Sequence, residues 1–333
     1  MGENAIPPRL HVLQAQGSDR ALIIARVRSK VYAFQLWNQS TNQRSKTLWY
    51  HGRVYEWRCD LSHDGRFLSF FATVPRPSDT SYGMTGVCRA PWGSPLFRWI
   101  QGHSDCGGGI FIDPRTLHLN VIDEPKKLKA TPPTDVVRAI KTLPFNVLTE
   151  PWDVGEDDPT RQMRLKRDGW WCIEEGGPWK VDPETGVWPE VEPVYRWSPQ
   201  MGNWHVDYIE EGVTFEQRPG GGHLRRYVMS SGVNVAEAMK IERLDHLAVD
   251  RMGRLLVAGD GYLKAVPVSA EGELGEPDAV LNFNRLNPED AKRKVDPRSR
   301  SSLRRAGRAV QGESSRPVSS SRMAARRFRR GKR

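Results

Sequence analysis

Residues 55–72 read YEWRCDLSHDGRFLSFFA, and the rest of the chain can be interpreted outward from them. An apolar run that ends at Leu61 leads into the turn-forming segment Ser62–Arg66, and a second apolar run, Phe67–Ala72, follows. Asp-Gly between two apolar runs is typical of a β-hairpin turn, because Gly adopts positive φ freely and Asp hydrogen-bonds the backbone two residues on. The second run is apolar at almost every position, which indicates a strand covered on both faces. These residues therefore predict a hairpin within a larger assembly of sheets.

The same order of strand, turn and strand recurs along the chain. Leu247–Ala258 aligns with Cys59–Phe70 without a gap and shares Gly-Arg after the turn. Six such units can be marked, at Asp19, Gly65, Gly109, Gly169, Gly202 and Gly253. The successive intervals of 46, 44, 60, 33 and 51 residues scatter around the roughly 40–50 residues of a β-propeller blade. The spacing predicts irregular blades.

Most units continue beyond the first hairpin. In the fourth unit, Met163–Leu165 and Trp170–Ile173 are expected as strands around a turn at Arg167–Gly169. In the fifth, Tyr195–Trp197 and Trp204–Val206 are expected as strands around a longer turn. Three other units carry two further strand-like runs each, which are Val31–Trp37 and Thr47–Tyr50, Thr85–Ala90 and Leu96–Ile100, and Gly261–Val266 and Ala279–Phe283. Four strands per unit is the blade of a β-propeller.

The turn itself has a family resemblance. Ser62–Leu68 resembles the S-P-D-G-[KR]-x-[LI] blade turn of TolB-like and WD40-like β-propeller repeat proteins, with His63 at the position of the Pro. The resemblance implies an all-β fold, and we expect a propeller of about six irregular four-stranded blades over residues 9–285. It implies little about function, because propellers serve as binding platforms and as many unrelated enzymes.

One interval is longer than the others because of residues 123–160, which are rich in Pro and charge. We expect an insertion on one face of the propeller, in the form of a long surface loop. Within it, Thr134–Lys141 is expected to form a short helix with Thr134 as its cap.

Basic charge is concentrated at the C-terminal end of the sequence. Residues 286–333 hold 16 of the 50 Lys and Arg residues and 4 of the 40 Asp and Glu residues, which gives this segment a net charge of +12. The remaining 34 basic and 36 acidic residues leave residues 1–285 at −2. A segment of Arg, Lys, Ser, Ala, Pro and Gly cannot bury enough apolar surface to offset its ordering entropy. We therefore expect a near-neutral folded body and a basic tail that is disordered when free.

The expected cellular compartment is inferred from the absence of membrane spans, signal segments and paired cysteines in the sequence. No apolar run reaches the length of a membrane span, and Met1–His11 has neither a basic n-region nor an apolar h-region. Its four cysteines form no C-x-x-C pair and stand at Cys59, Cys88, Cys106 and Cys172. This spacing is typical of free thiols, buried or partly buried, in a reducing compartment. We expect a soluble, monomeric, cytoplasmic protein that does not contact membranes.

The densest polar chemistry lies in residues 102–109, GHSDCGGG. His103 and Asp105 stand beside glycines that would let a ligand approach the backbone closely, so they are candidate binding residues. His103 and Cys106 have the spacing of half a zinc site, but no second pair stands at metal-ligand spacing. We therefore predict no metal and no cofactor. A loop between blades is the alternative interpretation of this stretch.

A second glycine-rich stretch, Pro219–His223, precedes Arg225 and Arg226. These two arginines, with Tyr227 after them, offer a basic and aromatic edge that suits phosphate. A solvated hairpin is the alternative here.

The tail carries three arginine clusters that no packing role explains, namely Arg304 with Arg305, Arg326 with Arg327, and Arg329 with Arg330. Such clusters attract nucleic acid or another polyanion through counterion release. Because Phe328 is the only aromatic residue of the tail, binding of this kind should be weakly sequence-selective. A terminus that only solubilises the protein is the alternative.

Local catalytic motifs are absent. The sequence has no G-x-S-x-G elbow and no H-E-x-x-H pair. Its tryptophans fall mostly in strand patterns, where packing between blades explains them. We therefore interpret the chain as a non-catalytic propeller scaffold or binding module for a protein partner, with the tail as a tether to nucleic acid or another polyanion. The alternative is a propeller hydrolase or lyase with an axial, metal-assisted site.

Overall fold

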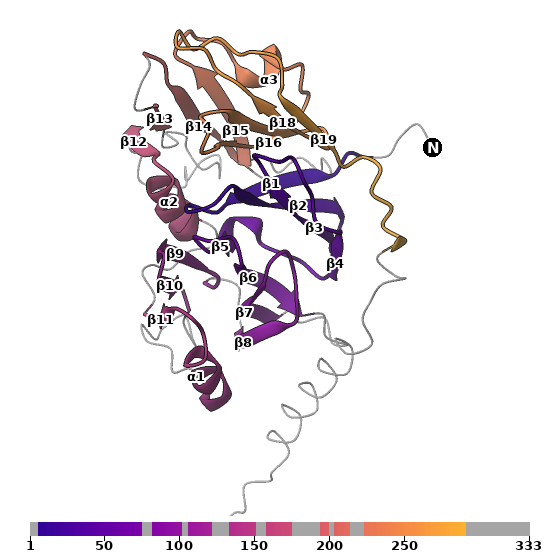
Figure 1. Ribbon diagram of the computed structural model, residues 1–333, viewed down its shortest axis with the longest axis vertical. Helices are drawn as coiled ribbons and strands as arrows, with labels where there is room; N and C mark the ends of the chain where they lie inside the picture. Colours follow the sequence, from indigo (N-terminus) through magenta and orange to yellow (C-terminus); the bar gives the residue numbers. More distant parts are fainter. Residues whose placement is uncertain are drawn as a thin grey trace, which may run out of the picture. The chain divides into compact units, whose positions relative to one another are not determined.

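The computed structural model describes residues 6–74, 82–101, 106–121, 133–150, 158–174, 194–199, 203–213 and 223–290 of the chain. Their strands form five sheets arranged as the blades of a β-propeller (Figure 1). His103, Asp105, the turn around Gly202 and the arginine clusters of the tail lie outside the described residues. At ten residues, the longest described helix is too short to cross a membrane.

Each blade is built from strands that are consecutive in the sequence. Blade 1 consists of β1 (Arg9–Gln14), β2 (Arg20–Arg28), β3 (Val31–Asn38) and β4 (Leu48–His51). Blade 2 consists of β5 (Asp60–Leu61), β6 (Phe67–Val74), β7 (Tyr82–Arg89) and β8 (Pro95–Gln101). Blade 3 consists of β9 (Gly109–Asp113), β10 (Thr116–Leu119) and β11 (Asn146–Leu148). Blade 4 consists of β12 (Trp171–Glu174), β13 (Val194–Trp197), β14 (Val206–Val213) and β15 (His223–Met229). Blade 5 consists of β16 (Leu244–Val249), β17 (Leu255–Gly259), β18 (Tyr262–Val266) and β19 (Ala279–Asn282).

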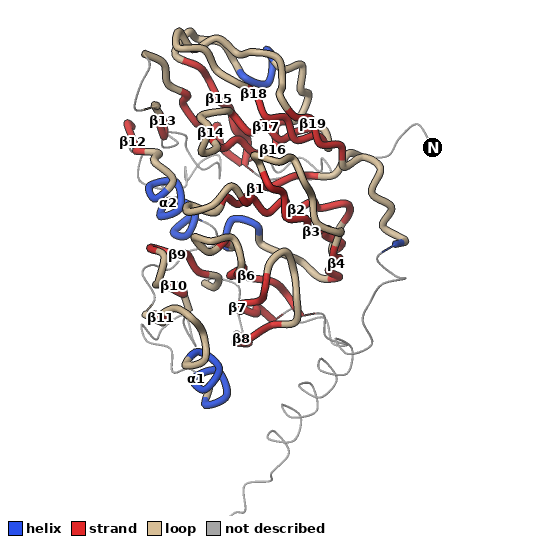
Figure 2. The backbone as a smooth tube through the Cα atoms, in the orientation of Figure 1, coloured by secondary structure: helices blue, strands red, loops and turns tan. Residues whose placement is uncertain are grey.

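Helices are few and short, as Figure 2 shows by colour. They are the 3₁₀ helix η1 (Glu56–Arg58), α1 (Thr134–Ile140), α2 (Asp158–Arg167) and α3 (Val235–Ala238). Neighbouring strands pair antiparallel within every blade, with one exception: β11 pairs parallel with β10.

In blades 1, 2 and 5 the second strand is buried on both faces, as predicted for Phe67–Ala72. In β2, Leu22 and Ile24 pack into the core shared with blade 2, whereas Ile23 packs into the core shared with blade 5. Because side chains alternate along a strand, one continuous apolar run supplies the contacts to both neighbouring blades. In β6, Phe70 likewise packs toward blade 1 and Phe67 toward blade 3.

The first and last blades meet through side chains and the N-terminal backbone. The backbone N–H of Leu10 on β1 donates to Asp245 Oδ2 on β16 at 3.0 Å. The guanidinium of Arg243 donates to the carbonyl oxygens of Pro7 and Pro8, at 3.0 and 3.2 Å, and to the carboxylate of Asp245. These bonds hold β1 against the inner strand of blade 5.

Helix α2 lies between blade 3 and blade 4 (Figure 1). On one side its residues contact β9 and η1, and on the other Leu165 packs against the core of blades 4 and 5. Between blades 3 and 4, contacts therefore run through the helix, whereas other adjacent blades pack directly against each other.

The structure has five blades, so the prediction of six was wrong. The expected fourth and fifth units both belong to blade 4, because Tyr195–Trp197 and the strand after it are β13 and β14, the second and third strands of that blade. A four-stranded blade contains three hairpin turns, and a strand-turn-strand pattern does not reveal which of the three it is. Blade 3 has three strands among the described residues, one fewer than expected.

Two local predictions were also wrong. Met163–Leu165, expected as a strand, lies in α2, and Arg167–Gly169 is the C-terminal end of that helix, where the N–H of Trp170 bonds the carbonyl of Leu165 at 2.9 Å. The described part of residues 123–160 is not a surface loop. It supplies β11 to blade 3 and helix α1, whose Val136 is buried in the core of blades 2 and 3.

The helix expected at Thr134–Lys141 is present, but its cap differs from the prediction. Pro133 is the N-cap and Thr134 is the first helical residue, with no side-chain cap hydrogen bond.

The Asp-Gly turn is confirmed in atomic detail. Gly65 has φ +71° and its N–H bonds the carbonyl of Ser62, while Gly253 has φ +77° and bonds the carbonyl of Asp250. In both turns the Arg after the glycine bonds a turn carboxylate, Arg66 with Asp64 and Arg254 with Asp250. The two units that aligned in sequence therefore share the glycine conformation and its backbone hydrogen bond, while the carboxylate that bonds the Arg stands at a different turn position.

Candidate functional site

Several first hairpin turns of the blades gather at one end of the propeller, which we call the turn face. The N–H of Gly17, in the β1–β2 turn, donates to the carbonyl of His63, in the β5–β6 turn, at 2.8 Å. The side-chain amide of Gln16 reaches Asp168 at the C-terminal end of α2, also at 2.8 Å. Gln14 Nε2 donates to the carbonyl of Val249, just before the β16–β17 turn, at 2.6 Å. Blades 1, 2 and 5 and helix α2 thus converge here.

A cavity of about 210 Å³ lies at the turn face, between β1, β16 and α2. We call it the axial cavity, because β1 and β16 are the inner strands of their blades. The side chains that give it chemical character are three tryptophans, Trp57, Trp170 and Trp197, and the polar groups of Arg164, Asp168 and Arg251. Trp170 is buried, whereas Trp57 and Trp197 are half-buried.

Helix α2 forms one wall through arginines spaced three residues apart. This spacing places them on one face of a helix. Arg164 donates to the carbonyl oxygens of Cys59 at 2.5 Å and Trp57 at 3.1 Å, and its guanidinium carbon lies 5.3 Å from the Trp57 ring centroid. Arg161 donates to the hydroxyl of Tyr208 in blade 4 at 3.2 Å. Burial lowers the pKa of Arg164, against the charges of Asp60 and Asp168.

Arg167 forms the centre of a buried ion pair. Its guanidinium donates to Asp60 Oδ2 at 2.5 Å and to the carbonyl of Phe111 at 3.1 Å, so it joins the inner strands of blades 2 and 3. The Asp60 carboxylate is fully buried and also accepts the N–H of Phe111 at 2.8 Å. Burial acts to lower the pKa of Arg167, but the charges of Asp60 and Asp168 outweigh it and the pKa is raised. Arg167 therefore stays charged.

Both carboxylates that line the axial cavity are already paired. Asp168 accepts from Gln16 and from Arg167, each at 2.8 Å. Asp250 accepts from Arg254 at 2.7 Å and from backbone N–H groups of its own turn, and its side chain is fully buried. Burial raises the pKa of Asp168, against the charge of Arg167.

Arg251 differs from the other charged groups of the axial cavity. It projects from the β16–β17 turn, is exposed, and makes no side-chain hydrogen bond or ion pair within the described part of the chain. Arg254, from the same turn, is paired with Asp250 and approaches Asp278 at 3.4 Å. Arg251 thus places an unneutralised positive charge at the cavity.

In the wall of the axial cavity, the imidazoles of His246 and His11 pack against the indole of Trp57. The ring centroids of His11 and His246 are 4.3 Å apart, and that of Trp57 lies 4.6 Å from His11 and 5.5 Å from His246. These rings belong to β1, β16 and η1, so the cluster joins three elements of the cavity wall. No group of three or more His, Cys, Asp or Glu side chains suited to a metal ion occurs among the described residues.

The predicted site residues do not gather at the axial cavity where they can be located. Arg225 and Arg226 lie on β15, the outermost strand of blade 4, and Arg226 is exposed. The other predicted binding residues are outside the described ranges.

Two of the glycines after Asp105 serve close packing. Gly107 and Gly108 have φ of +129° and +81°, and a Cβ on Gly108 would lie 2.1 Å from the carbonyl oxygen of Arg58. The group that lies close to the backbone of Gly108 is therefore helix η1.

The cysteines are free, as predicted, and Cys59, Cys88 and Cys106 are buried. Cys172 on β12 is exposed, contrary to the prediction of a buried or partly buried thiol, because all four residues of β12 are exposed.

No protein-family model matches the sequence, and no curated protein shows significant similarity to it. The site is therefore interpreted from its own geometry and from the propeller fold.

Sequence reasoning missed the axial cavity for two reasons. Strand patterns predict that the tryptophans pack between blades, which is correct for Trp37 and Trp99 but incomplete for Trp57 and Trp197. The turn-like residues Arg167–Gly169 predict a hairpin, whereas the arginines at every third position from Arg161 are the signal that indicates a helix.

Proposed function

We propose that this protein is a non-catalytic binding module that receives a protein partner on its turn face. The observation that carries the proposal is the axial cavity, where indole rings and an unpaired guanidinium are available while both carboxylates are held in ion pairs. General acid–base catalysis needs a titratable group within reach of the substrate. Asp168 and Asp250 are committed to Arg167 and Arg254, and the buried His246, which also lines the cavity, packs against His11 and Trp57. Such a cavity suits recognition better than chemistry.

Size supports the same proposal. The cavity volume of about 210 Å³ is smaller than the roughly 300–1,000 Å³ of typical small-molecule sites. It is larger than the engineered cavity of about 150 Å³ that takes up benzene. One large side chain of a partner would fill it, with the surrounding turns contacting the neighbouring residues of that partner.

A selection from a phage-displayed library of short random peptides tests this proposal, with the full-length protein as bait. Ala248 lines the axial cavity, and Ala248→Leu fills part of the space without a change of charge. Val233→Leu, at an exposed position after β15, is the matched control. We expect peptides that bind the wild type and the control but not Ala248→Leu, with unchanged circular dichroism of all three. Peptides that bind all three equally would contradict the proposal.

We also propose that the tail, residues 286–333, tethers the protein to nucleic acid or another polyanion. Its net charge of +12 and its three arginine clusters support this. The propeller body contributes little to such attraction, because its net charge is −2.

A further inference from the structure

The charges around the axial cavity do not cancel. Arg167 contacts the carboxylates of the buried Asp60 and of Asp168, at 2.5 and 2.8 Å, and the same two charges also act on Arg164, so these two carboxylates offset both helix arginines. Asp250 offsets Arg254 at 2.7 Å. Arg251 has no carboxylate partner among the described residues, so the lining presents its positive charge to an occupant.

This positive charge favours an aromatic side chain over a cationic one, although tryptophans can bind either. Indole faces attract cations, so an aromatic-lined cavity can take a Lys or Arg side chain. Here a guanidinium already lies over Trp57, since Arg164 is 5.3 Å from its centroid. A second cation would also meet Arg251 in a partly buried space, where like charges are weakly screened. An aromatic ring meets no such repulsion and packs well against Trp170 and Trp197.

We infer that the axial cavity receives an aromatic side chain from a partner segment that carries Asp or Glu beside it, and that Arg251 binds this carboxylate. The inference rests on the proposed function, because it names the chemistry of the partner at the same site. A guanidinium presents its N–H donors in a fork that matches a carboxylate, so Arg251 gives both charge and direction. The aromatic ring supplies buried area and the acidic residue sets the register.

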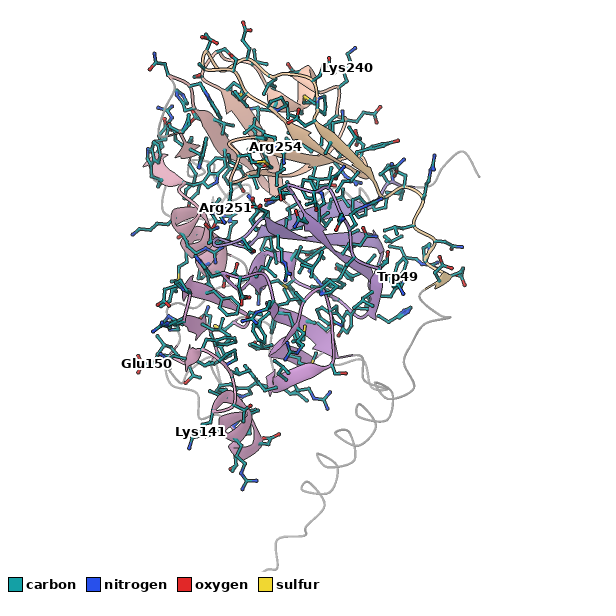
Figure 3. All side chains as sticks on the ribbon, viewed as in Figure 1. Trp49, Lys141, Glu150, Lys240, Arg251 and Arg254 are labelled. Carbon is teal, nitrogen blue, oxygen red and sulfur yellow. The ribbon has the colours of Figure 1, made fainter. Side chains whose placement is uncertain are left out.

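The test uses the peptides that the selection enriches, synthesised with a fluorescent label and titrated by fluorescence anisotropy. Binding is compared for the full-length wild type, Arg251→Glu and Lys240→Glu. Lys240 is the matched control, since it is exposed and lies before β16, at the end of that strand remote from Arg251 (Figure 3). A control with the acidic residue replaced by its amide, Asp→Asn or Glu→Gln, is made in the peptide.

We expect the enriched peptides to share an aromatic residue next to an acidic one. Arg251→Glu should weaken them by roughly five- to tenfold, because it replaces an attraction at the rim by a repulsion. Lys240→Glu should leave affinity unchanged, and the amide peptide should lose the difference between wild type and Arg251→Glu. At about 1 M salt, where the Debye length is about 3 Å, the wild type and Arg251→Glu should converge.

The failures are distinguishable. One outcome is a set of peptides that lose binding to Ala248→Leu but are basic or lack an acidic residue. These would overturn this inference and leave the proposed function standing. Equal losses for Arg251→Glu and Lys240→Glu would also overturn it, because the effect would then be one of net charge. A selection without any cavity-dependent peptide would overturn the proposed function and this inference together.

Discussion

Among single residues, Gly65 and Gly253 occupy corresponding positions in two turns that are distant in sequence. Both have positive φ, and each donates its N–H to the carbonyl of the residue three positions before it. The Arg after each glycine bonds a carboxylate, that of Asp64 two residues before it in one turn and that of Asp250 four residues before it in the other. The surroundings of the two glycines differ. A Cβ on Gly65 would lie 2.7 Å from Arg20 Cβ, whereas nothing lies within 4 Å of a Cβ on Gly253.

This difference gives the first prediction. Gly65→Val should lower the free energy of unfolding by about 1–3 kcal/mol, through strain at positive φ, and further through contact with Arg20. Gly253→Val should show the strain alone and therefore a smaller loss. Chemical denaturation of both variants measures the difference. Equal losses would mean that the contact with Arg20 costs nothing, and an unchanged Gly65→Val would contradict the turn assignment.

The thiols give a second prediction at this scale. Burial raises the pKa of Cys88 to about 12 and raises the pKa of Cys59 as well, while Cys106 is buried and Cys172 exposed. Because the thiolate is the reactive form, the native protein should react with a thiol reagent such as DTNB at Cys172 alone. Denaturation should then release the other three. Rapid native reaction at more than one cysteine, located by mass spectrometry, would show that the blade cores open readily.

At the scale of elements, helix α2 is what distinguishes this propeller from a plain ring of blades. Its arginines bond carbonyl or carboxylate oxygens of η1, β5 and β9. Its C-terminal end bonds the β1–β2 turn through Asp168. The helix thus ties the inner strands of blades 2 and 3 to the β1–β2 turn at the axial cavity.

The third prediction tests this role. Arg167→Met should destabilise the protein by about 3–5 kcal/mol, because it leaves the buried carboxylate of Asp60 without its charge partner. Lys166→Met, at the neighbouring exposed position, is the matched control and should change the free energy of unfolding little. Asp60→Asn combined with Arg167→Met should recover part of the loss, since the buried charge is then removed. A loss for Arg167→Met no larger than that of the control would contradict the role.

Some of the strands and helices could be predicted from the sequence and others could not. The strands of blades 1, 2 and 5 were predictable because continuous apolar runs such as Phe67–Ala72 and Leu255–Ala258 carry the contacts to both neighbours. Helix α2 was not, because Arg167-Asp168-Gly169 has the composition of a hairpin turn as well as that of a helix end. The site could not be predicted for a related reason. Arg251 and Asp168 belong to segments far apart in sequence, and they line one cavity only because blade 5 and the end of α2 pack beside β1.

For the whole molecule, we propose a division of function between the propeller and the basic segment 286–333. The fourth prediction concerns the tail. A variant that ends at Arg293 keeps Glu289, which pairs with Arg28 at 2.9 Å, and removes 14 basic and 2 acidic residues. It should retain the melting temperature of the full chain and lose most of its affinity for duplex DNA or RNA. In the full chain that affinity should fall steeply with salt, because each neutralised phosphate releases close to one counterion.

Binding measured for both chains at two salt concentrations checks this. Equal affinity of the two would refute the tether, and weak binding by the full chain at low salt would favour a tail that only solubilises the protein.

Indole signals in a ¹H–¹⁵N spectrum report whether a partner's side chain enters the axial cavity. The chain has 12 tryptophans, each with one indole N–H signal that a Trp→Phe variant assigns. On addition of a peptide from the selection, the signals of Trp57, Trp170 and Trp197 should shift together in the wild type and stay fixed in Ala248→Leu. Trp37 and Trp99, buried in other cores, should not respond. If only tryptophans outside the axial cavity shift and these three do not, the peptide does not enter the cavity and the proposed binding site is wrong.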